Sequence, residues 1–231
     1  MSDFSEIGSS RRWRATINTP PRTLKHADLY YSRDGEDVAL RTFFKRRIHE
    51  LIPGTYVDIG CLHPIASSNT YLFYCLGWSG VAIDLNKYHA PKWASERERD
   101  KFVCAAVGLG NVADVYQHKS NLGMTSIAAQ PNADFTLAGK LQTRPLAEIL
   151  DETLSAGCSV QFMSIDVEGA EVGVLQSNDW DKWRPEAILI ETQGLRLEDP
   201  YAHATTKYLR DLNYTIRSVV GGNVLVVDSK H

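Results

Sequence analysis

The stretch TYVDIGCLHPIASSNTYLFYCLGWSGVAID, residues 55–84, decides the fold. Residues 56–59 and 81–83 are short runs of β-branched and aromatic side chains, which are typical of buried strands. Residues 67–77 lie between them, with serine at the start, apolar residues at helical spacing and glycine at the end, which predicts a helix. A strand, a helix and a second strand in this order predict two parallel neighbours joined by a crossover.

A carboxylate stands at the end of each of these two strands. Ligands of open parallel sheets bind outside the carboxyl ends of the strands, where Asp58, Gly60 and Asp84 would lie. Asp84 follows Asp58 at close to the roughly 20-residue offset at which an acidic side chain binds ribose hydroxyls in dinucleotide folds. The loop after Gly60 lacks the further glycines that admit a pyrophosphate, and Asp58 would repel one. We therefore expect a cationic nucleoside, of which S-adenosylmethionine is the common example.

Composition narrows the class of protein. The chain has 231 residues, 43% of them hydrophobic, which suits one α/β domain. A formal net charge of −3 argues against a nucleic-acid partner. We find no signal-peptide pattern at the N-terminus and no apolar stretch long enough for a membrane span, so we expect a cytoplasmic protein. Four scattered cysteines, with no metal-binding spacing, are expected to be reduced core residues.

The rest of the chain divides into an arm, a domain and an insertion. Residues 1–27 are polar and basic and predict an N-terminal arm, followed by a single domain over residues 28–231. A helix is predicted over residues 32–51 and a charged, solvated one over residues 87–99. Residues 108–144 show no strong periodicity, which indicates either a functional lid or a small antiparallel insertion.

Five further strands are predicted downstream, over residues 101–107, 159–165, 187–190, 214–219 and 223–227. Gly221 and Gly222 between the last two indicate a hairpin, so the last strand should run antiparallel to its neighbour. The fold class is therefore α/β, a seven-stranded, mostly parallel sheet with an antiparallel last strand and helices on both faces.

More acidic residues fall at the same edge of this sheet. The fourth strand leads into Asp166 and Glu168, and the fifth ends at Glu191. So many carboxylates at one rim are costly unless a cation or hydroxyl donors occupy the site. The small residues Ala105 and Ala106 at the end of the third strand leave room for an adenine ring, although helix packing explains them equally well.

These residues carry a family resemblance, which covers roughly residues 30–195. The motifs are Ser32-x-x-Gly35-Glu36-Asp37, Tyr56-Val57-Asp58-Ile59-Gly60-x-x-His63-Pro64, Ser68-Asn69-Thr70-Tyr71, Gly77-Trp78-x-Gly80-Val81-x-Ile83-Asp84, Ser164-Ile165-Asp166-Val167-Glu168-Gly169 and Trp183-Arg184-Pro185. In this order and spacing the sequence resembles the FkbM family of S-adenosylmethionine-dependent methyltransferases. The resemblance implies the class I methyltransferase (Rossmann-like) fold and methylation of hydroxyl oxygens, often on sugars or polyketides.

The resemblance also implies roles for single residues. The turn at Asp58 and Gly60 would hold the methionine portion of the cofactor, and Asp84, followed by Leu85, would hold the ribose. The side chains expected to help frame the cofactor are Glu36, Asn69 and Thr70, and those expected beside the transferable methyl are Asp166 and Glu168. Two residues depart from the family pattern, Arg33 in place of the usual Gln and Leu62 in place of a frequent polar residue.

Methylation of an alcohol needs alignment and removal of a proton. His63 in the cofactor loop is the first candidate for the base, and its alternative role is to hydrogen-bond the loop. Asp166 or Glu168 could instead be the base, or could join Glu191 as oxygen ligands for Mg²⁺ or Ca²⁺.

The sequence therefore predicts an O-methyltransferase acting on a hydroxyl of a sugar, glycan or secondary metabolite. Its partners would be that small-molecule or glycan acceptor and, in one variant, further copies of itself as a homo-oligomer. Two alternatives stay open at this point: a nicotinamide-dependent oxidoreductase on the same sheet, which the missing glycines disfavour, and a nucleoside-binding module without chemistry.

Overall fold

The central stretch folds as predicted. In the computed structural model, β1 (Thr55–Ile59) and β2 (Ser79–Asp84) are parallel neighbours connected through α3 (Tyr71–Cys75). Asp58 stands opposite Ala82 in this pairing, so the two strands end at the same edge. The structure describes residues 29–120, 125–128 and 134–230, and the predicted N-terminal arm lies outside them.

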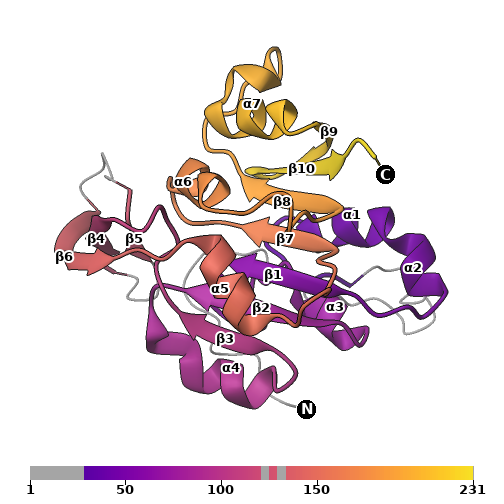
Figure 1. The fold of residues 1–231 in the computed structure, drawn as a ribbon, viewed down its shortest axis with the longest axis horizontal. Coiled ribbons are helices and arrows are strands. Elements are labelled where there is room, and N and C mark those ends of the chain that lie inside the picture. Colours follow the sequence, from indigo (N-terminus) through magenta and orange to yellow (C-terminus); the bar gives the residue numbers. More distant parts are fainter. Residues whose placement is uncertain (1–28, 121–124, 129–133, 231) are drawn as a thin grey trace, which may run out of the picture.

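Seven strands form the main sheet (Figure 1). The other members are β3 (Lys101–Cys104), β7 (Phe162–Ile165), β8 (Ala187–Glu191), β9 (Tyr214–Val220) and β10 (Asn223–Asp228). Their order is β3-β2-β1-β7-β8-β10-β9, and β10 runs antiparallel to both β8 and β9 while the remaining pairs are parallel. This confirms the predicted mostly parallel sheet with an antiparallel last strand.

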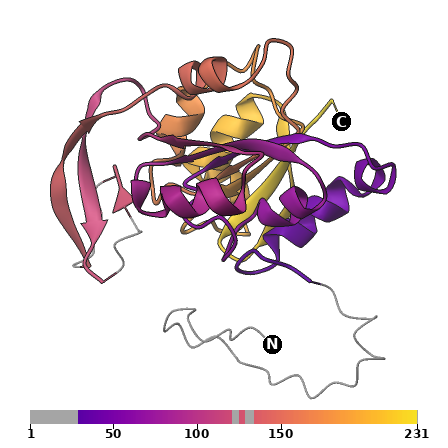
Figure 2. The same cartoon turned by 90° about the horizontal axis from the view of Figure 1, so that it is seen from below.

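Helices cover both faces of the sheet (Figure 2). One face packs against α1 (Glu36–Phe43), α2 (Lys45–His49), α3 and α4 (Ala90–Glu96); the other packs against α5 (Leu146–Thr153), α6 (Glu171–Gln176) and α7 (Ala204–Asp211). Short 3₁₀ turns occur at η2 (Lys87–His89) and η3 (Pro200–Ala202). Side chains alternate along β1, so Tyr56 joins the core under α1 and α3 while Val57 and Ile59 join the core under α5 to α7.

Two predicted helices differ from the structure. The helix expected over residues 32–51 is two helices, α1 and α2, interrupted at Phe44, whose ring is buried against Phe73 and Trp78. The expected solvated helix over residues 87–99 is shorter and is not solvated throughout, because Trp93 and Arg97 are each 1% exposed. Their burial depends on tertiary partners that the charged composition of the segment does not reveal.

The described residues of the segment 108–144 form a second, antiparallel sheet. It comprises β4 (Val112–His118), β5 (Thr125–Ser126) and β6 (Phe135–Gln142). Figure 2 shows this sheet standing at one side of the main body. Most of β6 is exposed, whereas Ser126 in β5 is buried, so β5 lies against the main body.

The four cysteines are free, but only Cys61 is buried. Cys75 and Cys104 are exposed, so the expectation that all four belong to the core is wrong for these two. Within the described part of the chain, no helix is long and apolar enough to cross a bilayer.

Candidate active site

A cavity of about 1280 Å³ lies beyond the carboxyl ends of the parallel strands. Residues from the ends of β1, β2, β3, β7 and β8 line it, together with the segment before α1, the β5 strand and the β9–β10 turn. Its volume exceeds the roughly 300–1,000 Å³ of a typical small-molecule site. The cavity therefore has room for two small molecules side by side, as a group transfer requires.

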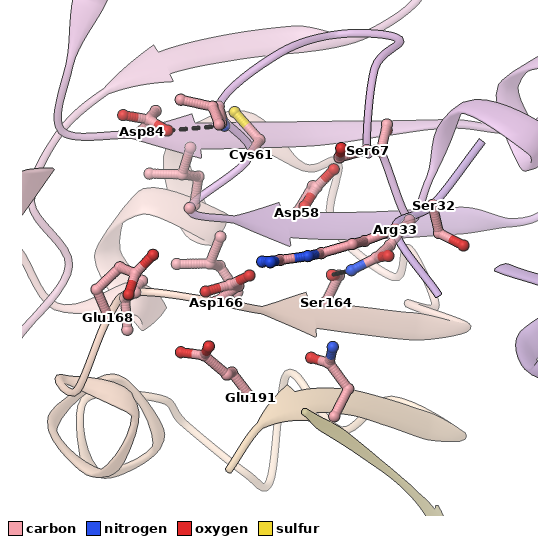
Figure 3. Close-up of a pocket in the computed structure, with 18 of the residues that line it drawn as sticks. Ser32, Arg33, Asp58, Cys61, Ser67, Asp84, Ser164, Asp166, Glu168 and Glu191 are labelled. Carbon is pink, nitrogen blue, oxygen red and sulfur yellow. Dashed lines mark hydrogen bonds between the residues drawn. The ribbon is translucent and has the colours of Figure 1, made fainter. Parts of the chain in front are cut away.

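Asp58 marks the β1 side of the cavity (Figure 3). The residue is 5% exposed, and its Oδ2 accepts a 2.7 Å hydrogen bond from the hydroxyl of Thr70. Burial raises the pKa of Asp58 to about 6, while the Thr70 hydrogen bond and the charge of Arg97 act in the lowering direction. Next to it, the amide of Asn69 donates to the hydroxyl of Ser164 on β7 at 3.0 Å, which ties the loop before α3 to the neighbouring strand.

Asp84 connects the β1 loop to the end of β2. One carboxylate oxygen accepts from the backbone N–H of Leu62 at 2.8 Å (Figure 3). The other accepts from the backbone N–H of Asn86 at 2.7 Å. Burial raises the pKa of Asp84. Each carboxylate oxygen can accept more than one hydrogen bond, so Asp84 can hold the loop and still accept from ribose hydroxyls.

Gly60 allows the closest approach of two strand ends at the floor of the cavity. It has φ +80°, and a side chain there would meet the backbone oxygen of Asp166. Only glycine fits such a contact in this backbone conformation. The end of β1 and the end of β7 are thereby brought together under the cavity.

His63 lies in the same loop but outside the cavity lining. Its Nδ1 accepts from the backbone N–H groups of Ile65 and Ala66 at 3.1 and 3.0 Å. Burial, with the nearby Lys92 and His89, lowers the pKa of His63 to about 4, so the ring is neutral and able to accept at neutral pH. These contacts match the alternative weighed for His63, a side chain that hydrogen-bonds the loop.

Three carboxylates gather at the other half of the cavity, those of Asp166, Glu168 and Glu191 (Figure 3). Burial raises the pKa of each of the three, and a neighbouring negative charge raises it further. The neighbouring charge is that of Glu191 for Asp166, of Glu171 for Glu168 and of Glu168 for Glu191. The amide of Gln193 donates to Glu191 at 3.2 Å and more distantly, at 3.4 Å, to Glu168. A carboxylate with a raised pKa in such a group is suited to take up a proton.

The turn that carries Asp166 and Glu168 is stabilised by Glu171, at the start of α6. The carboxylate of Glu171 accepts from the backbone N–H groups of Val167 and Gly169 at 3.3 and 3.0 Å, and Glu168 takes a left-handed φ of +56°. For the residues that the structure covers, no three His, Cys, Asp or Glu side chains are grouped so that they could hold a metal ion. The expected ligands for Mg²⁺ or Ca²⁺, Asp166, Glu168 and Glu191, thus line the cavity without forming such a group.

The segment before α1 closes one side of the cavity. Glu36 is 1% exposed and accepts from the backbone N–H of Asp34 at 2.7 Å and from the amide of Asn223 at 3.0 Å. The contact with Asn223 fixes this segment to the β9–β10 turn. Arg33 lines the cavity as well and extends into it on the side of Asp166 (Figure 3).

The structure brings most of the predicted site residues together. The predicted residues that line the cavity are Glu36, Asp58, Gly60, Asn69, Asp84, Leu85, Ala105, Ala106, Asp166, Glu168 and Glu191. Thr70 and His63 do not line it: Thr70 is fully buried behind Asp58, and His63 braces the loop. Sequence reasoning missed Ser126 and Asn223, because each is a single polar residue without a motif of its own, and it quoted Ser164 within a motif without giving it a role.

Comparison with known proteins identifies the family of the chain. Residues 58–216 match the family model described as the methyltransferase FkbM domain. The chain belongs to this family. It is therefore a methyltransferase enzyme, and because FkbM methyltransferases take the methyl group from S-adenosylmethionine, that compound is its cofactor. Membership decides against the nicotinamide-dependent oxidoreductase. No curated protein matches the chain significantly.

Two solved structures show a limited similarity to this FkbM chain. One is the precorrin-6y C5,15-methyltransferase of Geobacter metallireducens GS-15, with 12% identity, a TM-score of 0.38 and coverage of 79% of this chain and 84% of that one. The other is the 1,6-didemethyltoxoflavin-N1-methyltransferase of Burkholderia thailandensis with bound 1,6-didemethyltoxoflavin and S-adenosylhomocysteine. It has 15% identity, a TM-score of 0.37 and coverage of 87% and 91%.

Proposed function

We propose that this FkbM-family protein is an O-methyltransferase that transfers a methyl group from S-adenosylmethionine to a hydroxyl of a sugar, glycan or secondary metabolite. The observation that carries the proposal is the division of one cavity into two acidic halves. Asp58 and Asp84 stand at one half, and Asp166, Glu168 and Glu191 stand at the other. The first half suits a cationic nucleoside, and the second suits an acceptor that must lose a proton.

The lining residues fit the cofactor, which when bound supplies a methyl carbon activated by the adjacent sulfonium. Asp84 would accept hydrogen bonds from the ribose hydroxyls, next to Leu85, and Ala105 and Ala106 would leave space for the adenine. Asp58 would attract the positive charge of the methionine portion. Glu36 and Asn69 would complete this half, with Thr70 acting from behind Asp58.

We assign proton removal to the carboxylates and not to His63. Asp166 and Glu168 face the cavity and have raised pKa values, whereas Nδ1 of His63 already accepts two backbone hydrogen bonds. A hydroxyl acceptor would donate its proton to Asp166 or Glu168, with Glu191 adjusting their proton affinity through its charge. The same carboxylates can accept hydrogen bonds from the other hydroxyls of a sugar.

A screen of hydroxylated acceptors with isotope-labelled methyl donor tests the proposal. We expect label to enter an oxygen of at least one sugar, glycan or natural-product acceptor, and Asp166→Asn to lower turnover by about 10²-fold or more while cofactor binding persists. His63→Ala should affect turnover less than Asp166→Asn. Transfer of label only to nitrogen or carbon acceptors would contradict O-methylation, and a larger effect of His63→Ala would return the base to His63.

A further inference from the structure

A buried network stands behind Asp58 on the side away from the cavity. Arg97 and Asp100 form an ion pair of 2.7 Å in which both side chains are at most 1% exposed. The Arg97 guanidinium also donates to the carbonyl of Pro64 at 2.8 Å and to the hydroxyl of Thr70 at 3.1 Å. Thr70 in turn donates to Asp58 at 2.7 Å. The network thus runs without a break from a buried ion pair to a carboxylate of the cavity.

The chemistry of the donors fixes the direction of these hydrogen bonds. A guanidinium has no acceptor atom, so the Thr70 oxygen must accept from Arg97. A hydroxyl has a single proton, and this proton is then available for Oδ2 of Asp58. Ser68 Oγ lies 3.3 Å from the same hydroxyl and adds a second contact that restricts its rotation. The arrangement suits an ionised Asp58, because both of its oxygens are then acceptors and a hydrogen bond to the charged form favours that form.

The network does not neutralise Asp58. Arg97 already has a carboxylate partner in Asp100, which also accepts from the hydroxyl of Tyr56 and from the backbone N–H of Gly80. The cation is therefore balanced within the network, and Asp58 receives a hydrogen bond in place of an ion pair. Its negative charge stays available to a positive ligand in the cavity.

We propose that Thr70 and Arg97 are positioning residues that keep Asp58 ionised and oriented for the cationic end of the cofactor. Neither residue lines the cavity. Their effect on binding would pass through the protonation state of Asp58. This inference rests on the proposed placement of S-adenosylmethionine in the cavity.

Other titratable groups around Asp58 are compatible with this role. Asp100 and Asp84 oppose its ionisation by like charge, Arg97 favours it, and the Cys61 thiol, buried beside these carboxylates, is held neutral by a raised pKa. The partner of Asp58 on β7, Ser164, does not titrate, and Arg33 reaches the cavity from the segment before α1. Since burial alone pushes Asp58 toward the neutral form, the hydrogen bond from Thr70 is the direct opposing contact.

Thr70→Val is the discriminating variant, because it keeps the shape of the side chain and removes the hydroxyl. We would measure the affinity for S-adenosylmethionine by calorimetry between pH 5.5 and 8. In the wild type, binding should weaken below about pH 6 as Asp58 becomes protonated. In Thr70→Val the midpoint should move up by about one pH unit, which makes binding about fivefold weaker at pH 6 and nearly equal at pH 8. Thr70→Ser should restore the wild-type midpoint.

Two controls separate this effect from general damage. Asp58→Asn should bind S-adenosylmethionine weakly, and its affinity should show no midpoint between pH 5.5 and 8. Any pH dependence left in this variant comes from the cofactor or from other groups. Thr42→Val removes a hydroxyl that bonds to the Val38 carbonyl on the surface of α1 and should leave the midpoint unchanged. If Thr70→Val lowers the affinity for S-adenosylmethionine by the same factor at every pH, with no shift of the midpoint, Thr70 has only a structural role. That result would overturn the proposal.

A second measurement needs no cofactor. The carboxyl carbon of Asp58 can be titrated by ¹³C NMR in the free protein, with Asp58→Asn to assign the signal. The inference predicts a higher pKa for Asp58 in Thr70→Val and the wild-type value in Thr70→Ser. An unchanged pKa would refute the inference even if the protein binds the cofactor. If the wild type shows no binding of S-adenosylmethionine but the pKa of Asp58 moves as expected, the placement of the cofactor fails and the network is upheld.

Discussion

A Cβ atom at Gly60 would lie 1.7 Å from the backbone oxygen of Asp166. The first strand of the sheet and the strand that carries the acidic turn therefore meet without any side chain between them. The two halves of the cavity are joined at this contact, since Gly60 follows Asp58 and Asp166 opens the acidic turn. The contact places the cofactor residues and the candidate base at a fixed separation.

Gly60→Ala should destabilise the protein far more than an alanine at a glycine with open surroundings. We expect a loss of about 3 kcal/mol or more in the free energy of unfolding, because the backbone must move to relieve the overlap. Gly77 is a matched control: its φ is +89°, yet nothing lies within 4 Å of a Cβ there, so Gly77→Ala should cost about 1 kcal/mol of conformational strain. Denaturant unfolding of both variants measures the difference, and equal losses would contradict the argument.

Asp84→Asn should release the β1 loop as well as weaken cofactor binding. The amide that replaces one carboxylate oxygen would face the backbone N–H of Leu62 or Asn86, donor against donor. We expect at least about tenfold weaker binding of S-adenosylmethionine by calorimetry. Asp211→Asn, at an exposed carboxylate on α7, should bind as the wild type does. Wild-type affinity in Asp84→Asn would remove Asp84 from the site.

The acidic half should make the protein less stable at high pH. The folded-state pKa of Asp166 is raised well above its ordinary value, so the folded protein binds this proton more tightly than the unfolded chain does. Stability from this group is complete below the ordinary carboxyl pKa and is lost as the pH rises through the raised value. Asp166→Asn should therefore raise the free energy of unfolding at pH 8 and have little effect at pH 3.5. A variant that is less stable than the wild type at pH 8 would contradict this sign.

Glu191→Gln should shift the pH dependence of turnover. The negative charge of Glu191 contributes to the raised pKa of Asp166, so its removal lowers that pKa. If Asp166 acts as the base, the acid limb of the pH–rate profile moves to lower pH, because the ionised base is present at lower pH. The measurement is kcat against pH for both proteins with the same acceptor. If the acid limb of the profile stays in place or moves to higher pH, Asp166 is not the group whose ionisation produces that limb.

Ser126→Ala should affect the acceptor and spare the cofactor. The Ser126 hydroxyl donates to the backbone oxygen of Glu168 at 2.9 Å and accepts from the N–H of Ala128 at 2.9 Å, which holds β5 against the acidic turn. Loss of these bonds should raise the KM for the acceptor several-fold and leave the affinity for S-adenosylmethionine unchanged. Ser95→Ala, at an exposed helix position, is the control. An equal loss of cofactor affinity would place β5 at the wrong half of the cavity.

Local sequence was sufficient for the sheet and for most of the cavity. The parallel strands β1, β2, β7 and β8 each stop at a carboxylate or glycine. Because strand ends share one edge, Asp58, Asp84 and Asp166 could be placed together before any coordinates. The hairpin at Gly221 followed from turn chemistry in the same way. These features depend on neighbours in the chain or on the geometry of parallel sheets.

Long-range partnerships could not be predicted. Arg97 appears in the sequence as one charge in a charged helix, and its burial depends on Asp100, Tyr56 and the carbonyl of Pro64. Thr70 appeared as a residue of the cofactor frame, and only its contact with Asp58 shows that it lies behind the cavity wall. Single polar residues that pair across the fold leave no periodic signal.

Among the described residues of the small sheet of β4 to β6, those that line the cavity lie in or next to β5, its shortest strand, and the long strands stand at one side of the main body. If Ser126→Ala affects the acceptor and spares the cofactor, as expected above, acceptor selectivity is separable from cofactor binding in this protein. Replacing residues 112–142 with the matching segment of a relative that uses another acceptor would then change the acceptor selectivity. Binding of the methyl donor, S-adenosylmethionine, would be preserved. A fold of this kind can acquire new acceptors by exchange of its small peripheral sheet, while the cofactor site and the acidic turn stay the same.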